Sequence, residues 1–181
     1  MSEKKDLVVL FPGIRYSVDC PLLYYAGVKY EKMGYEKVCI TGYGIDDTKY
    51  SLEEYAELAT ESVKEQLQGI DFTAYGNIVF VSKSMGTVLA PWAEDYFQIP
   101  GVTHVLLTPI NATFPFLTLK RKVKFITSGT RDSKVDLDRL RKICKKNNFP
   151  LRIIKNVGHS LESRKNVKKD IEILRKLVDY M

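Results

Sequence analysis

The chain of 181 residues has few cysteines, few histidines and no long apolar run, and these shortages exclude several classes of protein. Its three cysteines, Cys20, Cys39 and Cys144, are far apart and form no C-x-x-C pair. This pattern favours free thiols in a reducing compartment over a disulfide framework. No apolar stretch approaches the length of a membrane span, and the apolar run before Pro12 is too short for a signal-peptide core. We therefore expect a cytoplasmic protein with no membrane partner.

Motifs that hold metals or nucleotides are also missing. The sequence contains no H-E-x-x-H, no cluster of Cys and His residues and no glycine-rich phosphate loop. We therefore expect neither a metal ion nor another cofactor.

The net charge of +6 is unevenly distributed along the chain. Residues 1–118 hold 9 Lys+Arg against 15 Asp+Glu, whereas residues 119–181 hold 19 against 7. Such asymmetry occurs in proteins that bind nucleic acids or anionic substrates. No nucleic-acid-binding motif accompanies the charge here, and part of it falls on the polar side of an amphipathic helix. We therefore expect a solvated basic face and no nucleic-acid partner.

Strand-like and helix-like segments alternate along the whole chain. Short apolar runs predict strands at 6–11, 37–41, 78–81, 104–108, 123–128 and 151–155. Helical spacing of apolar residues predicts helices at 21–33, 51–69, 87–97, 136–146 and 167–178. Segment 109–119, which carries two prolines, is predicted to be an irregular loop or a short lid. The alternation predicts one α/β domain over 1–181, a three-layer sandwich with a mostly parallel sheet of about six strands and helices on both faces.

The segment from Asn77 to Gly86 carries the first chemical signal. Its apolar residues are typical of a strand buried on both faces, and Ser82-Lys-Ser-Met-Gly86 then leads into a helix. This S-x-S-x-G turn resembles the nucleophile elbow of the α/β-hydrolase family, which is usually G-x-S-x-G. The resemblance assigns Ser84 as the nucleophile. For these five residues alone, an ordinary strand end followed by a helix cap remains an alternative.

The resemblance extends over nearly the whole chain and implies a small α/β-hydrolase without a cap domain. In that family the acid and the histidine follow the serine in this order, in loops after later strands. Asp132 follows the fifth predicted strand, and His159 follows the sixth. The resemblance therefore implies a catalytic triad of Ser84, Asp132 and His159, in which the histidine is the base and the aspartate fixes its tautomer.

Other residues compete for these roles. Asp136 and Asp138 follow Asp132 closely, but their positions are typical of acids at a helix N-terminus. His104 lies within an apolar run, as a core or strand-end histidine would. Lys83, beside the proposed nucleophile, is interpreted as a solvated turn residue, with an influence on the potential at the site as the alternative.

The resemblance also implies an oxyanion hole of two backbone N–H groups. One belongs to Met85, the residue after the nucleophile. The other lies in the loop after the first strand, where we assign Ile14 because Pro12 has no N–H. The family often has His-Gly in this loop, whereas this chain has Pro-Gly. Residues expected at the substrate pocket are Arg15, Tyr16, Phe114 and Phe116.

These features predict a serine hydrolase that cleaves a small ester or thioester through an acyl-enzyme intermediate. Its expected partner is a small-molecule substrate, and a weak homodimer is left open. The alternative function is an α/β-hydrolase scaffold that binds a small molecule without turnover. The sequence does not identify the substrate, because one fold supports many chemistries.

Overall fold

The computed structural model of the protein describes residues 4–163 and 165–181. Within these residues the core is a six-stranded sheet with strand order β2-β1-β3-β4-β5-β6, and every pairing between neighbours is parallel. The strands are β1 (Asp6–Phe11), β2 (Tyr35–Cys39), β3 (Ile78–Lys83), β4 (Thr103–Leu107), β5 (Lys122–Gly129) and β6 (Leu151–Ile154).

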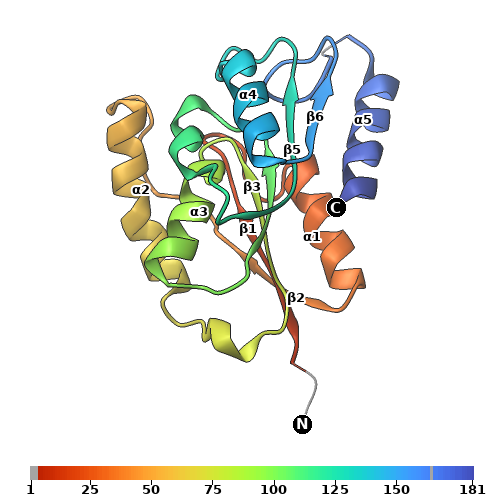
Figure 1. Ribbon diagram of the computed structural model, residues 1–181. Coiled ribbons are helices and arrows are strands. Elements are labelled where there is room, and N and C mark those ends of the chain that lie inside the picture. The colour runs from red at the N-terminus through yellow and green to blue at the C-terminus, as the bar shows by residue number, and fades with distance from the viewer. Residues whose placement is uncertain (1–3, 164) are drawn as a thin grey trace.

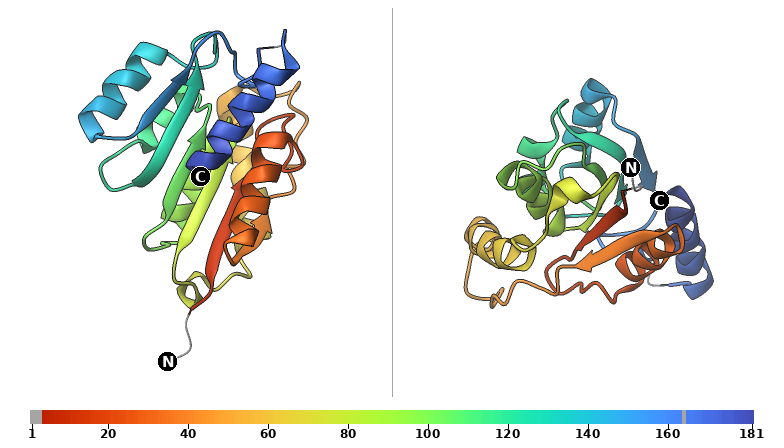
Figure 2. Two further views of the ribbon diagram at one scale, coloured as in Figure 1. Left: turned by 90° about the vertical axis from the view of Figure 1, so that its right-hand side faces the viewer. Right: turned by 90° about the horizontal axis from the view of Figure 1, so that it is seen from below.

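Helices cover both faces of the sheet, so the predicted three-layer α/β arrangement is confirmed (Figure 1). They are α1 (Pro21–Lys32), α2 (Leu52–Leu67), α3 (Gly86–Tyr96), α4 (Leu137–Asn147) and α5 (Val167–Tyr180), with 3-10 helices η1 (Phe72–Ala74) and η2 (Asn111–Phe116). Helices α1 and α5 pack on one face, and α2, α3 and α4 pack on the other (Figure 2). No helix of the described segments is long and apolar enough to cross a membrane.

Strand β1 illustrates why the strands are apolar at every position. Leu7 and Val9 pack into the core under α2 and α3, whereas Val8 and Leu10 pack into the core under α1 and α5. All four side chains are at most 1% exposed. Each buried aliphatic side chain contributes about 1.5–3 kcal/mol of transfer free energy, so both helical layers are held firmly to the sheet.

Local signals in the sequence start and stop the helices as predicted. The hydroxyl of Ser51 accepts from the N–H of Glu54, whose carboxylate accepts from the N–H of Ser51, so α2 begins in a capping box. Helix α1 begins at Pro21, and Gly34 follows its end with a φ of 91°. The carboxylate of Asp136 caps α4.

Most predicted bounds lie within one or two residues of the observed ones, and two segments need a correction. Strand β2 occupies residues 35–39 instead of 37–41, because the left-handed Gly34 reverses the chain and Tyr35 already pairs with Asp6. Segment 109–119 is not irregular, since it contains η2. In η2, Thr113 is 0% exposed and Phe114 is 5% exposed, so the segment is packed onto the fold.

The strand order places a topological switch point between β1 and β3. After β1 the chain turns to β2 on one side, and it returns through α2 to β3 on the other side of β1. The loops that leave the carboxyl ends of β1 and β3 therefore diverge, and α/β proteins bind their ligands at such a switch point. Here these two loops begin at Pro12 and Ser84.

Candidate active site

Ser84 occupies a strained turn between β3 and α3. Its φ of 53° lies in the left-handed region, which costs a non-glycine residue about 1–3 kcal/mol. Both backbone groups are fixed, because the Ser84 N–H donates to the Leu107 carbonyl at 3.0 Å and the Thr87 hydroxyl donates to the Ser84 carbonyl at 2.6 Å. These contacts hold the backbone of Ser84 at the carboxyl end of β3.

The residues two before and two after Ser84 are both small but lie in different surroundings. A Cβ on Gly86 would lie 2.4 Å from the Phe11 carbonyl oxygen, so no side chain fits there. Ser82 stands in place of the family's first glycine and is completely buried. Its hydroxyl donates to the Val105 carbonyl at 3.2 Å, which removes the cost of burying it. A serine is therefore accommodated at the first position but not at the second.

Three side chains from distant parts of the chain form one hydrogen-bonded series. His159 Nδ1 lies 2.8 Å and 3.0 Å from the two carboxylate oxygens of Asp132, and His159 Nε2 lies 2.7 Å from the Ser84 Oγ. Because a carboxylate accepts only, Nδ1 carries the proton and donates it. The lone pair of Nε2 then accepts from the Ser84 hydroxyl. This is the arrangement in which a serine can lose its proton to an imidazole.

Asp132 is buried and ionised in this series. Its side chain is 0% exposed, and its Oδ1 accepts from the Lys134 N–H at 2.9 Å. Burial alone would raise the pKa of this carboxyl, but hydrogen bonds from His159 and Lys134 and the charge of Lys83 outweigh burial and lower the pKa. The carboxylate therefore carries its negative charge beside the His159 ring.

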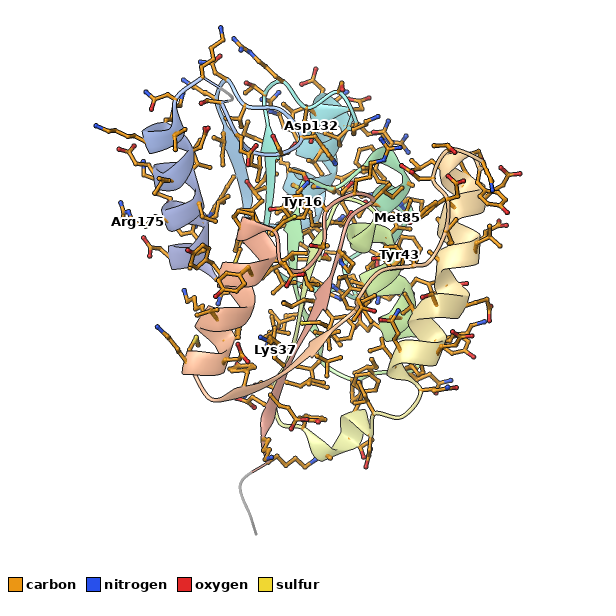
Figure 3. The ribbon with its side chains drawn as sticks, turned by 180° about the vertical axis from the view of Figure 1, so that it is seen from behind. Tyr16, Lys37, Tyr43, Met85, Asp132 and Arg175 are labelled. Atoms are coloured by element: carbon orange, nitrogen blue, oxygen red, sulfur yellow. The ribbon has the colours of Figure 1, made fainter. Side chains whose placement is uncertain are left out.

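The two loops that carry Asp132 and His159 are bonded to each other. The Arg131 N–H donates to the Val157 carbonyl at 2.9 Å, and the Asn156 N–H donates to the Thr130 hydroxyl at 2.9 Å. Both loops leave the carboxyl ends of adjacent strands, β5 and β6. In Figure 3, Asp132, Tyr16 and Met85 lie toward one end of the sheet, well away from Lys37.

The loop after β1 and the start of α3 both lie beside Ser84. Met85 precedes the first turn of α3, where N–H groups have no partner within the helix. A Cβ on Gly13 would lie 3.0 Å from the Ser84 Cβ, so the loop after β1 passes directly beside the serine. The Gly13 N–H already donates to the Tyr16 carbonyl at 3.0 Å, and Ile14 is the next residue along this loop.

The structure corrects the interpretation of Lys83 as a solvated turn residue. Lys83 is 2% exposed, and its ammonium donates to the Thr108 hydroxyl at 2.5 Å and to the His159 carbonyl at 2.9 Å. It ends strand β3, and its side chain lies among the loops that follow the neighbouring strands. A signal was present in the sequence, because only one small residue, Ser82, separates Lys83 from the apolar run Ile78–Val81 of the same strand.

Two threonines missed at the level of sequence connect η2 to the serine turn. The hydroxyls of Thr87 and Thr113 lie 2.6 Å apart, and the Thr87 hydroxyl also contacts the Ser84 carbonyl. The 109–119 segment therefore supports the turn that presents Ser84. Thr87 and Thr113 gave no sequence signal, since threonine is common in helices and loops alike.

The four residues expected at the pocket lie in different surroundings. Arg15 is exposed and pairs with Asp47 at 2.8 Å. Tyr16 lines a cavity of about 160 Å³ beside Ser160, and its hydroxyl accepts from the Leu22 N–H. Phe114 packs into the core under the Arg139 guanidinium, and Phe116 is partly buried against the core. The two rings therefore anchor segment 109–119 to the core, and their contact with substrate stays a prediction.

The competing acids and the second histidine have other partners. Asp136 accepts from the Arg139 N–H, and Asp138 lies in the first turn of α4. His104 is 1% exposed, and its Nε2 lies 2.8 Å from a carboxylate oxygen of Glu94. Among the described residues, no group of three or more His, Cys, Asp or Glu side chains is arranged to hold a metal ion.

Comparison with solved structures shows that the chain has the α/β-hydrolase fold. An α/β serine hydrolase homologue from Coxiella burnetii is 13% identical with a TM-score of 0.68, and the match covers 99% of this chain and 86% of that one. Esterase Pf2001 from Pyrococcus furiosus is 14% identical, with a TM-score of 0.65 and coverage of 99% and 82%. Est1E from Butyrivibrio proteoclasticus is 12% identical, with a TM-score of 0.63 and coverage of 98% and 89%. No protein-family model and no curated protein matches the sequence.

Proposed function

We propose that the protein is a serine hydrolase that cleaves a small ester or thioester through an acyl-enzyme intermediate. The observation that carries this proposal is the hydrogen-bonded series from Asp132 through His159 to Ser84, with the serine in a left-handed turn. A free serine hydroxyl is a weak nucleophile, and a positioned imidazole makes it a strong one. A scaffold that only bound its ligand would have no need of this series or of the strain at Ser84.

The first half of the reaction forms the acyl-enzyme. The Ser84 Oγ attacks the carbonyl carbon of the substrate while His159 Nε2 takes the hydroxyl proton. Asp132 holds the imidazole through Nδ1–H and stabilises the imidazolium. The tetrahedral intermediate then collapses, and the alcohol or thiol leaves with the proton that His159 returns.

The second half regenerates the enzyme with the same groups. A water molecule gives a proton to His159 Nε2 and attacks the acyl carbon, and the carboxylic acid leaves as Ser84 recovers its proton. In both halves a negative charge forms on the carbonyl oxygen. We assign its stabilisation to the N–H groups of Met85 and Ile14, where the start of α3 and the loop after β1 flank the serine.

The choice of an acyl substrate has independent support from the fold. One of the structural neighbours, Pf2001, is an esterase by name, and Est1E has been solved with ferulic acid bound. Those properties belong to distant relatives, so they indicate a class of reaction and leave the acyl group open.

Labelling with a fluorophosphonate probe tests the proposal directly. The Ser84 Oγ should displace fluoride and form a stable phosphonyl ester, which mass spectrometry of the digested protein locates. The Ser84→Ala variant should take up no label. Ser82→Gly, which restores the family's usual glycine beside the turn, should be labelled like the unaltered protein. An adduct on another residue, or none on folded protein, would refute the assignment.

A further inference from the structure

Lys83 is a buried charge that the proposed reaction does not use. It is 2% exposed and directly precedes Ser84 in the chain. Burial lowers its pKa to about 8, although the carboxylates of Asp132 and Glu162 oppose this effect. At neutral pH the side chain therefore carries a charge that water no longer solvates. Replacing a buried charge by an apolar side chain of similar size is often neutral or stabilising, so stability alone does not account for a lysine here.

The ammonium of Lys83 connects loops that follow three other strands. After β4, the Thr108 hydroxyl accepts from Nζ at 2.5 Å, and after β6, the His159 carbonyl accepts at 2.9 Å. After β1, the Tyr16 ring has its centroid 5.0 Å from Nζ, so the third side of the ammonium faces an aromatic ring. These three contacts match the three N–H donors of a lysine.

One of these contacts is to the backbone of the proposed base itself. The imidazole of His159 is 26% exposed and is carried by a loop in which Asn156 and Leu161 both have positive φ. The hydrogen bond that Nδ1 donates to Asp132 fixes the ring, whereas the hydrogen bond that Lys83 donates to the His159 carbonyl fixes the main chain that carries the ring. Since a displacement of about 1 Å at a reacting group lowers a rate by roughly 10²-fold, the position of this backbone matters for turnover.

We propose that Lys83 is a positioning residue of the active site, which ties the His159 backbone to the ends of β3 and β4 and thereby keeps the imidazole within reach of Ser84. This inference rests on the proposed hydrolase function. It predicts that loss of the ammonium slows the chemical step while the fold remains at least as stable.

The test compares Lys83→Met with Lys124→Met, a matched substitution at the other end of the sheet. Lys124 also extends from a strand, donates to a backbone carbonyl (that of Met181) and approaches an aromatic ring (that of Tyr30). With p-nitrophenyl acetate, Lys83→Met should lower kcat by about 10- to 100-fold and change KM by less than about 2-fold. Its urea midpoint at pH 7 should equal or exceed that of the unaltered protein. Lys124→Met should leave kcat within about 2-fold.

A second variant separates positioning from a general loss of structure. Thr108→Val keeps the size of the side chain and removes one of the two oxygen acceptors of Lys83. It should lower kcat in the same direction but less, and the double variant should be no slower than Lys83→Met alone, because both changes break one network. Additive losses would contradict a shared role.

The labelling rate of Ser84 by the fluorophosphonate distinguishes the two proposals. Absence of label on the unaltered protein would overturn the hydrolase function and, with it, the role of Lys83 in turnover. Equal labelling rates in the unaltered protein and in Lys83→Met would overturn the positioning role and leave the hydrolase function intact. If Lys83→Met is less stable than the unaltered protein, and its unfolded fraction accounts for the lost activity, the positioning role is also overturned.

Discussion

Gly129 and Val157 touch so closely that no side chain fits between them. A Cβ on Gly129 would lie 2.3 Å from the Val157 carbonyl oxygen and 2.8 Å from the Gly158 carbonyl oxygen. Gly129 ends β5 just before the loop of Asp132, and Val157 lies two residues before His159. The absence of a side chain at Gly129 thus lets the acid loop and the base loop pack against each other.

Gly129→Ala should therefore destabilise the protein and weaken the proposed triad together. The added methyl group must push the two loops apart, and such overpacking costs about 1–3 kcal/mol. Gly158→Ala is the matched control, since its Cβ would meet the Arg131 carbonyl at an ordinary 3.7 Å. Urea unfolding of both variants measures the difference. Equal stabilities would show that the loops relax without cost.

Asp132→Asn should lower kcat by about 10⁴-fold, because an amide does not hold the imidazole in the tautomer that accepts the serine proton. Asp136→Asn is the control, since asparagine caps a helix about as well as aspartate. Steady-state kinetics on a p-nitrophenyl ester measure both variants. If the losses came out reversed, the acid of the triad would be Asp136.

His159→Ala should remove nearly all turnover and leave the fold intact, because it deletes the base that contacts Ser84. His104→Gln should keep most of the activity, since His104 is bonded to Glu94 within the core. Circular dichroism and kinetics on both variants separate loss of chemistry from loss of fold. Substantial turnover in His159→Ala would rule out this histidine as the base.

The buried ammonium of Lys83 should make stability rise with pH in the alkaline range. Burial lowers the pKa of Lys83 from its ordinary 10.5 to about 8. Below pH 8 the folded and unfolded chains both hold the proton, and its burial costs stability. As the pH rises from 8 to 10.5, the folded chain releases the proton while the unfolded chain keeps it, so the free energy of unfolding increases.

This linkage is measured as a difference between the unaltered protein and Lys83→Met. Urea unfolding at a series of pH values should show the stability advantage of the methionine variant shrinking by about 2–3 kcal/mol between pH 8 and 10. Other tyrosines, cysteines and lysines titrate in both proteins and cancel. A difference that stays constant over this range would show that burial does not lower the pKa of Lys83 in the folded protein.

The acyl group of the substrate should be short or of medium length. Segment 109–119, the segment expected to cover the site, is too short for a helical cap domain. Each methylene that becomes buried should improve transition-state binding by about 0.8 kcal/mol until the pocket is full. In a p-nitrophenyl ester series from acetate to laurate, kcat/KM should peak early and then decline. A rise that continues to laurate would contradict a small pocket.

The sequence by itself determined the order and type of the elements. Apolar runs and helical spacing predicted the six strands and five helices, and turn residues such as Pro21, Ser51 and Gly34 marked helix ends, because these signals act within a few residues. The resemblance to the α/β-hydrolase motif singled out the small residues around Ser84 and the order of Asp132 and His159, since the motif depends on a local strand–turn–helix and on loops that follow strands.

Only the tertiary structure decided how distant loops meet at the ends of the strands. Lys83 contacts His159 across 76 positions of the chain and Thr108 across 25, and no periodicity encodes such distances. A lysine in a turn is usually solvated, and burial of Lys83 depends on partners that β1, β4 and β6 bring to it. Likewise, the hydrogen bond between the hydroxyls of Thr113 and Thr87 joins η2 to α3. Through-space contacts of this kind arise when the sheet assembles, so local patterns alone do not specify them.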